Sequence, residues 1–131
     1  MKRRKDGGLQ TDPGRQVADG IYAAGDIAAF PLCGRSDRIR VEHWRVAEQH
    51  GRIAALNMLG REVAYDAVPY FRTIHYKQRL DYVGHAETWD EIVVDGDLEK
   101  PEFLACYLYG GGCMPLPAGC VTGRWPLSFD L

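Results

Sequence analysis

The hydrophobic pattern of this chain changes its period once, close to residue 66. Before this point, residues 42–59 place apolar side chains at helical spacing, and Gly60 follows as a helix stop signal. After it, apolar and polar residues alternate, which is typical of strands that bury one face. The sequence therefore predicts an α+β chain of two parts, residues 1–65 and residues 66–131.

The second part is predicted to begin as an antiparallel meander. Its strands cover residues 71–76, 79–85, 90–95 and 102–109. Asp95-Gly96-Asp97 is a turn signal between the last two strands. The segment from Gly110 to Leu131 contains three consecutive glycines and three prolines and shows no hydrophobic period. We expect no regular structure there, and an aberrant or frame-shifted tail from about residue 112.

The first part contains one predicted strand besides the helix. Residues 20–26 form a short apolar run that ends in Gly-Asp, which is typical of a buried strand that stops at a sheet edge. Residues 6–19 and 31–40 are rich in turn-forming residues and are predicted loops. Within the helix, small side chains recur every fourth residue, at Ala47, Gly51 and Ala55. Such a stripe lets a neighbouring element approach the helix closely.

Composition and charge narrow the range of functions. The formal net charge of −2 gives no reason to expect nucleic acid or an anionic membrane as a partner. No apolar stretch approaches the roughly 18 residues of a membrane-spanning helix, and the basic residues 1–5 do not lead into a signal-peptide core. A cytoplasmic protein is therefore expected. The cysteines form no C-x-x-C pair and the histidines no H-E-x-x-H pattern, so we expect reduced thiols and no metal site.

The first motif that can carry chemistry is the end of the predicted strand, Gly25-Asp26. Small residues at a strand end let a cofactor lie close to the backbone, because no side chain blocks its approach. The carboxylate of Asp26 can accept a hydrogen bond from a sugar-type hydroxyl, as acidic residues do with ribose. The alternative is a buried strand followed by an aspartate that caps a turn.

The second motif, Glu42-His43-Trp44, opens the predicted helix. The free N–H groups of a first helical turn and the positive end of the helix dipole favour an anionic or electron-rich group. Trp44 is suitably placed to lie against a ring system. The alternative is that Glu42 complements the helix dipole while Trp44 packs in the core.

In this order the two motifs resemble a known family. The run G-I-Y-A-A-G-D-I-A, a short loop and R-V-E-H-W-R-V-A-E-Q-H-G-R-I-A-A-L-N-M-L-G are similar to the closing part of the FAD-binding domain in apoptosis-inducing-factor-like reductases. That group includes the ferredoxin, rubredoxin and putidaredoxin reductases. The later segments V-P-Y-F-R-T, L-D-Y-V-G and G-D-L resemble the start of the family's C-terminal interface domain. The resemblance covers roughly residues 7–110.

The resemblance implies a fold and a function. Residues 1–65 would end a Rossmann-like FAD-binding domain, and residues 66–131 would begin an antiparallel β-meander interface domain. The family moves a hydride from NAD(P)H to FAD and then passes electrons singly to a ferredoxin-type or other acceptor; FAD chemistry is tuned by the protein around it. A homodimer is left open, and no separate catalytic residue is implied.

The resemblance also implies roles for five residues. Gly25 and Asp26 would bind the ribityl chain of FAD. Glu42, His43 and Trp44 would lie at the pyrimidine side of the isoalloxazine ring, mainly through their backbone N–H groups.

The sequence also departs from the family pattern. The G-x-G-x-x-G turn that holds the FAD pyrophosphate and the NAD(P)H-binding domain do not occur in it. Arg72 stands where relatives often carry tryptophan, which removes an expected aromatic contact to the flavin. We therefore expect a reductase fragment that is inactive alone. The alternatives are a non-catalytic dimerisation or interaction module derived from such a reductase, and a pseudogene product with no stable function.

Overall fold

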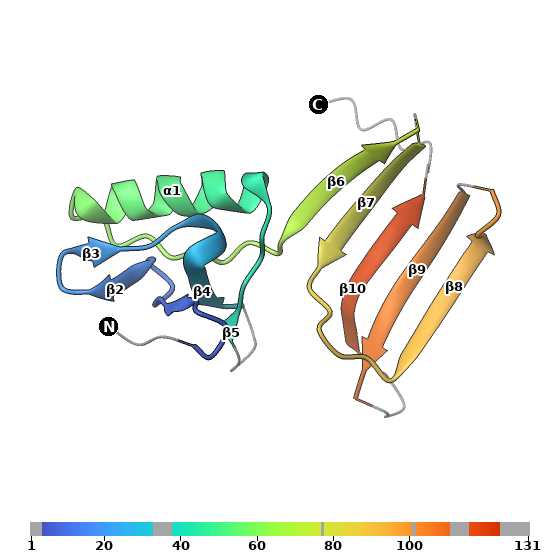
Figure 1. The fold of residues 1–131 in the computed structure, drawn as a ribbon, viewed down its shortest axis with the longest axis horizontal. Helices are drawn as coiled ribbons and strands as arrows, with labels where there is room; N and C mark the ends of the chain where they lie inside the picture. The colour runs from blue at the N-terminus through green and yellow to red at the C-terminus, as the bar shows by residue number, and fades with distance from the viewer. Residues whose placement is uncertain (1–3, 33–37, 77, 101, 111–115, 124–131) are drawn as a thin grey trace. The chain divides into compact units, whose positions relative to one another are not determined.

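The computed structural model describes residues 4–32, 38–76, 78–100, 102–110 and 116–123. It separates into two compact units, Met1–Pro69 and Tyr70–Leu131, which we call unit 1 and unit 2 (Figure 1). Among the described residues, unit 1 holds one α-helix and unit 2 a five-stranded antiparallel sheet. The α+β class that the sequence predicts is therefore confirmed.

Unit 1 is built from short strands beside the helix. Its elements are β1 (Leu9–Gln10), β2 (Gln16–Ala18), β3 (Ile21–Tyr22), the 3-10 helix η1 (Gly25–Ile27), β4 (Ala28–Pro31), β5 (Arg38–Ile39) and α1 (Trp44–Met58). Strand β4 pairs with β1 in parallel and with β5 in antiparallel orientation, while β2 and β3 form a separate hairpin. The two predicted loops thus contain strands β1, β2 and β5.

The buried strand of unit 1 is β4, and the strand predicted at residues 20–26 was wrong in its position. Strand β3 is only two residues long, and Ile21 keeps 53% of its surface exposed. Gly25 has a φ of +74°, which ends any extended strand, so the chain passes through η1 before it extends again. Only then does it become fully buried, from Ala28 to Phe30.

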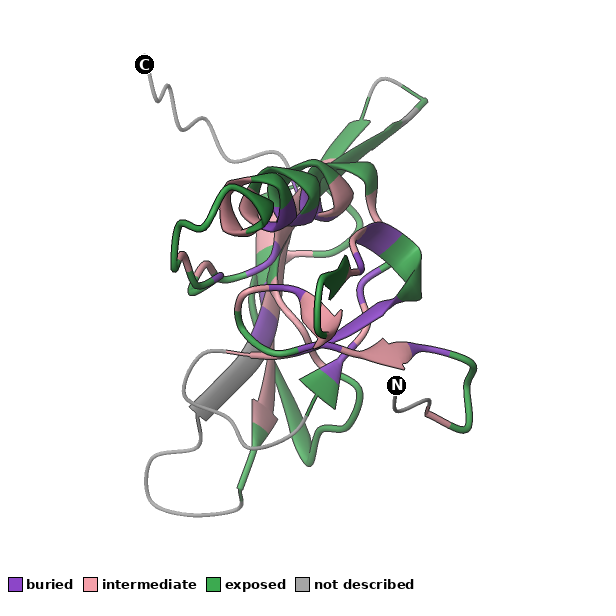
Figure 2. Cartoon of the chain, turned by 90° about the vertical axis from the view of Figure 1, so that its left-hand side faces the viewer, coloured by how far each residue is buried: buried purple, intermediate pink, exposed green. Residues whose placement is uncertain are grey.

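Helix α1 confirms the predicted helix, although it begins two residues later. The side chain of His43 caps its first turn, and Gly60 follows its last turn with a φ of +77°. Figure 2 shows the buried side of the helix, which is formed by Val46, His50 and Ala54. These side chains pack over a core in which Phe30 and Tyr65 meet edge to face, with 5.5 Å between their ring centroids.

Unit 2 is an open antiparallel sheet. Its strands are β6 (Tyr70–His75), β7 (Gln78–Gly84), β8 (Glu91–Asp97), β9 (Glu102–Tyr109) and β10 (Leu116–Gly123). They lie in the order β6-β7-β10-β9-β8, so the predicted strands are found as β6 to β9 (Figure 1). The predicted turn at residues 95–97 was wrong, because β8 runs through it to Asp97. Gly96 is needed there for another reason: a Cβ would collide with the backbone of Glu102 on the neighbouring strand.

Strand β10 corrects the expectation of no regular structure after Gly110. Residues 116–123 form a strand between β7 and β9 and bond to both. Pro117 and Gly119 weaken the strand signal in the sequence, since both residue types are rare in strands. Gly119 nevertheless fits this place, because a Cβ there would lie 2.5 Å from the Tyr82 hydroxyl oxygen and the tyrosine side chain would have to move. Residues 111–115 and 124–131 of the predicted aberrant tail lie outside the described residues.

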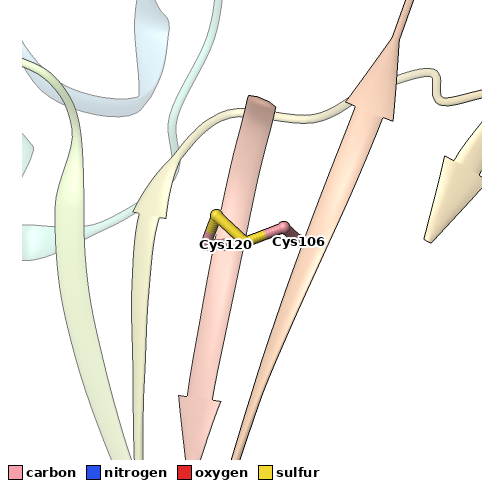
Figure 3. The surroundings of a disulfide bond; sticks show 2 residues. All are labelled: Cys106 and Cys120. Carbon is pink, nitrogen blue, oxygen red and sulfur yellow. A yellow bond between two sulfur atoms is a disulfide. The ribbon is translucent and has the colours of Figure 1, made fainter. Parts of the chain in front are cut away.

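The cysteines also differ from the expectation of reduced thiols. Cys106 of β9 and Cys120 of β10 are directly opposite each other, with their Cα atoms 4.1 Å apart, and form a disulfide (Figure 3). No sequence pattern indicates this pairing, because the two residues are 14 positions apart and only the β9–β10 register brings them together. Cys33 and Cys113 lie outside the described residues.

Candidate functional site

The two sequence motifs meet where η1 packs against the first turn of α1. A Cβ added to Gly25 would lie 3.3 Å from the Cβ of Ala47, which is tighter than most real contacts between such atoms. Gly25 is buried, and its φ of +74° is a conformation that other residues adopt at a cost. Both the backbone conformation and the close approach of the helix therefore favour glycine here.

Asp26 points its carboxylate into solvent at this junction. It follows the buried Gly25 directly, and its own side chain is exposed. Among the residues that the structure describes, no donor forms a hydrogen bond or ion pair with this carboxylate. Within the described segments Asp26 caps no turn, so its side chain is available to a ligand.

His43 and Trp44 form the start of the helix. The Nδ1 atom of His43 accepts a hydrogen bond of 3.2 Å from the backbone N–H of Arg45, which fixes the imidazole against the first turn. The ring of Trp44 lies 5.7 Å from that imidazole, between ring centroids, and Trp44 keeps 65% of its surface exposed. The alternative reading of Trp44 as a core residue is therefore wrong within this chain.

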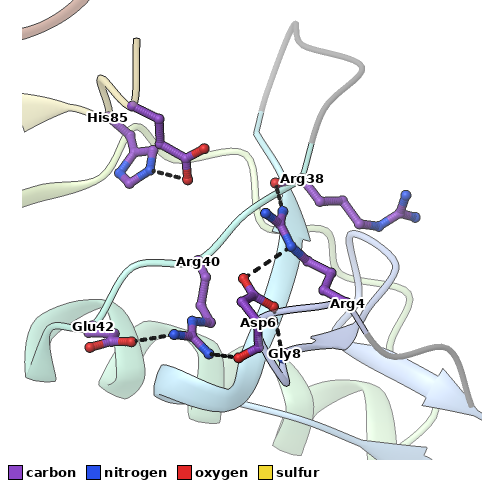
Figure 4. A network of polar contacts seen from close by, with 8 residues as sticks. Arg4, Asp6, Gly8, Arg38, Arg40, Glu42 and His85 are labelled. Atoms are coloured by element: carbon purple, nitrogen blue, oxygen red, sulfur yellow. Dashed lines mark hydrogen bonds and ion pairs between the residues drawn. The ribbon is translucent and has the colours of Figure 1, made fainter.

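Glu42 lies in a network of charged groups that leads back to the start of unit 1 (Figure 4). Its carboxylate accepts a hydrogen bond of 2.6 Å from Arg40, which also donates to the backbone carbonyl of Asp6 at 3.2 Å. A hydrogen bond from the Gly8 N–H, with the charges of Arg4 and Arg40, holds the pKa of Asp6 below its usual value. The network fastens the segment before α1 to the turn before β1.

Behind the site lies a buried guanidinium that sequence reasoning missed. Arg15 and His50 are both fully buried, and Nη1 of Arg15 lies 3.4 Å from Nε2 of His50. The guanidinium carbon lies 4.7 Å from the ring centroid of Phe30 and 5.0 Å from that of Tyr65, and the carbonyl of Pro13 accepts two of its hydrogen bonds. In the sequence Arg15 stands among turn-forming residues, which gives no signal of burial.

This environment shifts two pKa values strongly. Burial lowers the pKa of Arg15 to about 10, so the guanidinium still carries its charge at neutral pH. Burial, together with the positive charge of Arg15, lowers the pKa of His50 to about 4. His50 is therefore a neutral acceptor, and the pair joins the β2–β3 hairpin to the middle of α1.

Arg72 lies on β6 of unit 2, in register with Asp81 of β7. Burial alone would raise the pKa of Asp81, but hydrogen bonds from Arg79 and Tyr70 outweigh it and the pKa lies below its usual value. Arg72 adds a further positive charge beside the same carboxylate. Its side chain is exposed.

Comparison with known proteins gives related sequences and folds, although no family model matches the chain. Human apoptosis-inducing factor 3 is 41% identical over 92 residues, which is 70% of this chain and 15% of that protein. The ferredoxin–NAD(+) reductase component of the anthranilate 1,2-dioxygenase system of Burkholderia cepacia is 34% identical over 122 residues, 91% of this chain and 30% of that one. Because this alignment covers 91% of the chain, it includes residues beyond 112 wherever it begins.

The fold is also similar to a solved reductase. The crystal structure of a covalent complex of putidaredoxin reductase with putidaredoxin matches 94% of this chain and 29% of that one, with a TM-score of 0.76 and 30% identity. The chain thus spans less than a third of the length of each of these relatives. No helix among the described residues is long and apolar enough to cross a membrane. By sequence and by fold, the chain is therefore similar to one part of the apoptosis-inducing-factor-like proteins and the ferredoxin reductases.

Proposed function

We propose that unit 1 forms one wall of an FAD site in a reductase that oxidises NAD(P)H and passes electrons to a ferredoxin-type acceptor. The observation that carries the proposal is the contact of Gly25 with Ala47. It places the exposed carboxylate of Asp26 beside the first turn of α1, so that an acceptor for hydroxyl groups and a helix N-terminus lie together. When bound, FAD would supply the redox chemistry, taking a hydride and releasing electrons one at a time.

Asp26 is proposed to hold the ribityl chain. Its carboxylate is exposed, and it follows the buried Gly25 directly. A hydroxyl that donates to a carboxylate forms a charge-assisted hydrogen bond, which is about twice as strong as a neutral one. Gly25 would contribute by letting η1 approach α1, because it has no Cβ that would press on Ala47.

The start of α1 is proposed to face the pyrimidine side of the isoalloxazine ring. The positive end of the helix dipole stabilises negative charge, which is the charge that this side gains on reduction. His43 holds the first turn in place through Arg45, and Trp44 presents an exposed ring beside it. Glu42 would act through its backbone, because its carboxylate is held by Arg40.

The pyrophosphate-binding turn and the NAD(P)H-binding domain of such an enzyme are proposed to lie outside the segments that the structure describes. The sequence contains no G-x-G-x-x-G motif, the turn that holds a dinucleotide pyrophosphate. We therefore propose that the 131-residue chain does not turn over NADH or NADPH by itself. The ferredoxin-type acceptor is proposed because one matched structure is a complex of putidaredoxin reductase with putidaredoxin.

The proposed flavin wall can be tested by grafting it into a complete reductase, which supplies the parts that this chain does not. Residues 8–69 of this chain would replace the matching segment of putidaredoxin reductase, and the purified graft would be examined for bound flavin by its visible absorbance. We expect a yellow protein that oxidises NADH with a dye acceptor. A folded graft that stays colourless in excess FAD would contradict the proposal.

A second candidate function is a dimerisation module without redox activity. It is favoured by edge strand β8, where Ile92, Val93 and Val94 keep 47%, 46% and 42% of their surfaces exposed although all three are apolar. An unpaired edge with such side chains is a surface for another strand. Analytical sedimentation of the chain distinguishes the two candidate functions. A dimerisation module predicts a dimer that forms without flavin and that the Val93→Lys variant dissociates.

A further inference from the structure

Strand β10 is the element that joins the two halves of the unit 2 sheet. Within the described strands, β6 and β7 form one hairpin and β8 and β9 another, and β7 and β8 do not pair with each other. Strand β10 bonds to β7 on one side and to β9 on the other. If β10 leaves the sheet, the two hairpins lose their hydrogen-bonded connection.

The sequence of β10 is poor for a strand in this position. It contains Pro117, Gly119 and Gly123 within eight residues, and its register with β9 shifts between Pro117 and Gly119. Proline donates no ladder hydrogen bond, and glycine loses more backbone entropy than other residues when it is ordered. The disulfide from Cys120 to Cys106 therefore holds a strand whose own preferences do little to keep it in place.

The disulfide is partly accessible to solvent. Cys106 and Cys120 are both partly exposed. Their neighbours in the same row of the sheet are Val93 and Val83, which keep 46% and 43% of their surfaces exposed. An exposed disulfide is of the kind that thiols reduce and that serves regulation, whereas buried structural disulfides resist the glutathione pool.

We propose that Cys106 and Cys120 are a redox-active pair that couples the thiol–disulfide balance of the surroundings to the integrity of the unit 2 sheet. A thiolate of glutathione attacks one sulfur, the S–S bond breaks and the other cysteine leaves as a thiolate that takes up a proton. A second glutathione thiolate attacks the mixed disulfide. The products are two cysteine thiols and one oxidised glutathione, so two electrons and two protons have moved to the protein.

The first test is a titration of the pair. The full chain, and a Cys33→Ser/Cys113→Ser variant in which only the proposed pair remains, would be equilibrated with reduced and oxidised glutathione in varied ratio. Free thiols would be alkylated and counted by mass spectrometry. In both proteins we expect the pair to be half reduced at a glutathione ratio that lies within the range tested. A pair that stays oxidised at the most reducing ratio, or reduced at the most oxidising one, would overturn the proposal.

The second test is amide hydrogen exchange in the same two-cysteine variant. We expect the amides of residues 119–123 to exchange at least about tenfold faster after reduction, because the closed loop no longer restrains the strand. Adding Cys106→Ser to this variant should give the fast rate in either redox state. Equal rates in the oxidised and reduced protein would show that the disulfide does not control β10, and would also overturn the proposal.

Discussion

Nη1 of Arg15 lies 3.4 Å from Nε2 of His50 in the core of unit 1, where both side chains are fully buried. A cation can be buried there because the Pro13 carbonyl and the rings of Phe30 and Tyr65 surround it. The imidazole accepts from the guanidinium only while it is neutral. Protonation of His50 would place two positive charges against each other.

Lowering the pH should therefore destabilise unit 1. The pKa of His50 is about 4 in the folded chain and 6.5 for an ordinary histidine, so between these values the unfolded chain binds the additional proton. The free energy of unfolding should keep its full value above pH 6.5. It should fall by about 3 kcal/mol as the pH drops towards 4. Urea unfolding followed by helical circular dichroism measures it.

The matched controls are His50→Gln and His85→Gln. The first should remove most of the pH dependence between pH 6.5 and 4, at the cost of lower stability at neutral pH. The second replaces a histidine of unit 2 that bonds to Glu87 and should leave the unit 1 transition as it is. A pH profile that persists in His50→Gln would assign the effect to other groups.

The contact between Gly25 and Ala47 predicts a rescue. Gly25→Ala should destabilise unit 1 by about 1–2 kcal/mol for its positive φ, with an added cost for the tight contact to Ala47. Gly20→Ala is the control, because Gly20 has a φ of +67° but open space where its Cβ would lie. Ala47→Gly alone should cost about 1 kcal/mol as a glycine in a helix; adding Gly25→Ala to Ala47→Gly should then cost less than adding it to the parent chain, by the cost of the tight contact. Equal losses for Gly20→Ala and Gly25→Ala would argue against a tight junction.

Trp44 is predicted to contact the flavin in the graft of unit 1 into putidaredoxin reductase. Its ring is 65% exposed at the start of α1, so FAD at this position would quench its fluorescence. Trp44→Phe should remove a large share of the quenching, compared with the graft that retains Trp44. The same quenching in both proteins would assign it to a tryptophan of the host enzyme.

The sequence correctly predicts those helices and strands whose local residue pattern agrees with their surroundings in the fold. Helix α1 has apolar spacing, a polar residue at its start and Gly60 at its end, and strands β6 to β9 alternate in polarity. The family is also recognisable, because several spaced motifs occur in order. For the candidate site, the sequence predicted two flavin-binding segments, which stays a prediction, and the structure adds that Gly25 and Ala47 bring these segments together.

What the sequence could not predict depends on contacts between distant residues. Strand β10 contains proline and glycine, and only its place between β7 and β9 makes it a strand. The Cys106–Cys120 disulfide follows from that register. Burial of Arg15 requires two aromatic rings and a histidine, which come from positions 15 to 50 residues away in the chain. The buried strand was placed too early because the positive φ of Gly25 interrupts the apolar run.

The flavin affinity of Asp26 variants is the most direct test of the proposed FAD wall. In the graft, Asp26→Asn should weaken FAD binding by about 1.5–3 kcal/mol, or roughly 10- to 150-fold in Kd, because a charge-assisted hydrogen bond is lost. Asp19→Asn is the matched control, since Asp19 is an exposed acid of the same unit outside the site. Titration of each apoprotein with FAD, followed by flavin fluorescence, gives the ratio of Kd values. A weakened Asp26→Asn beside an unchanged Asp19→Asn is predicted; equal FAD affinity of Asp26→Asn and its parent would contradict the assignment of Asp26 as a flavin ligand.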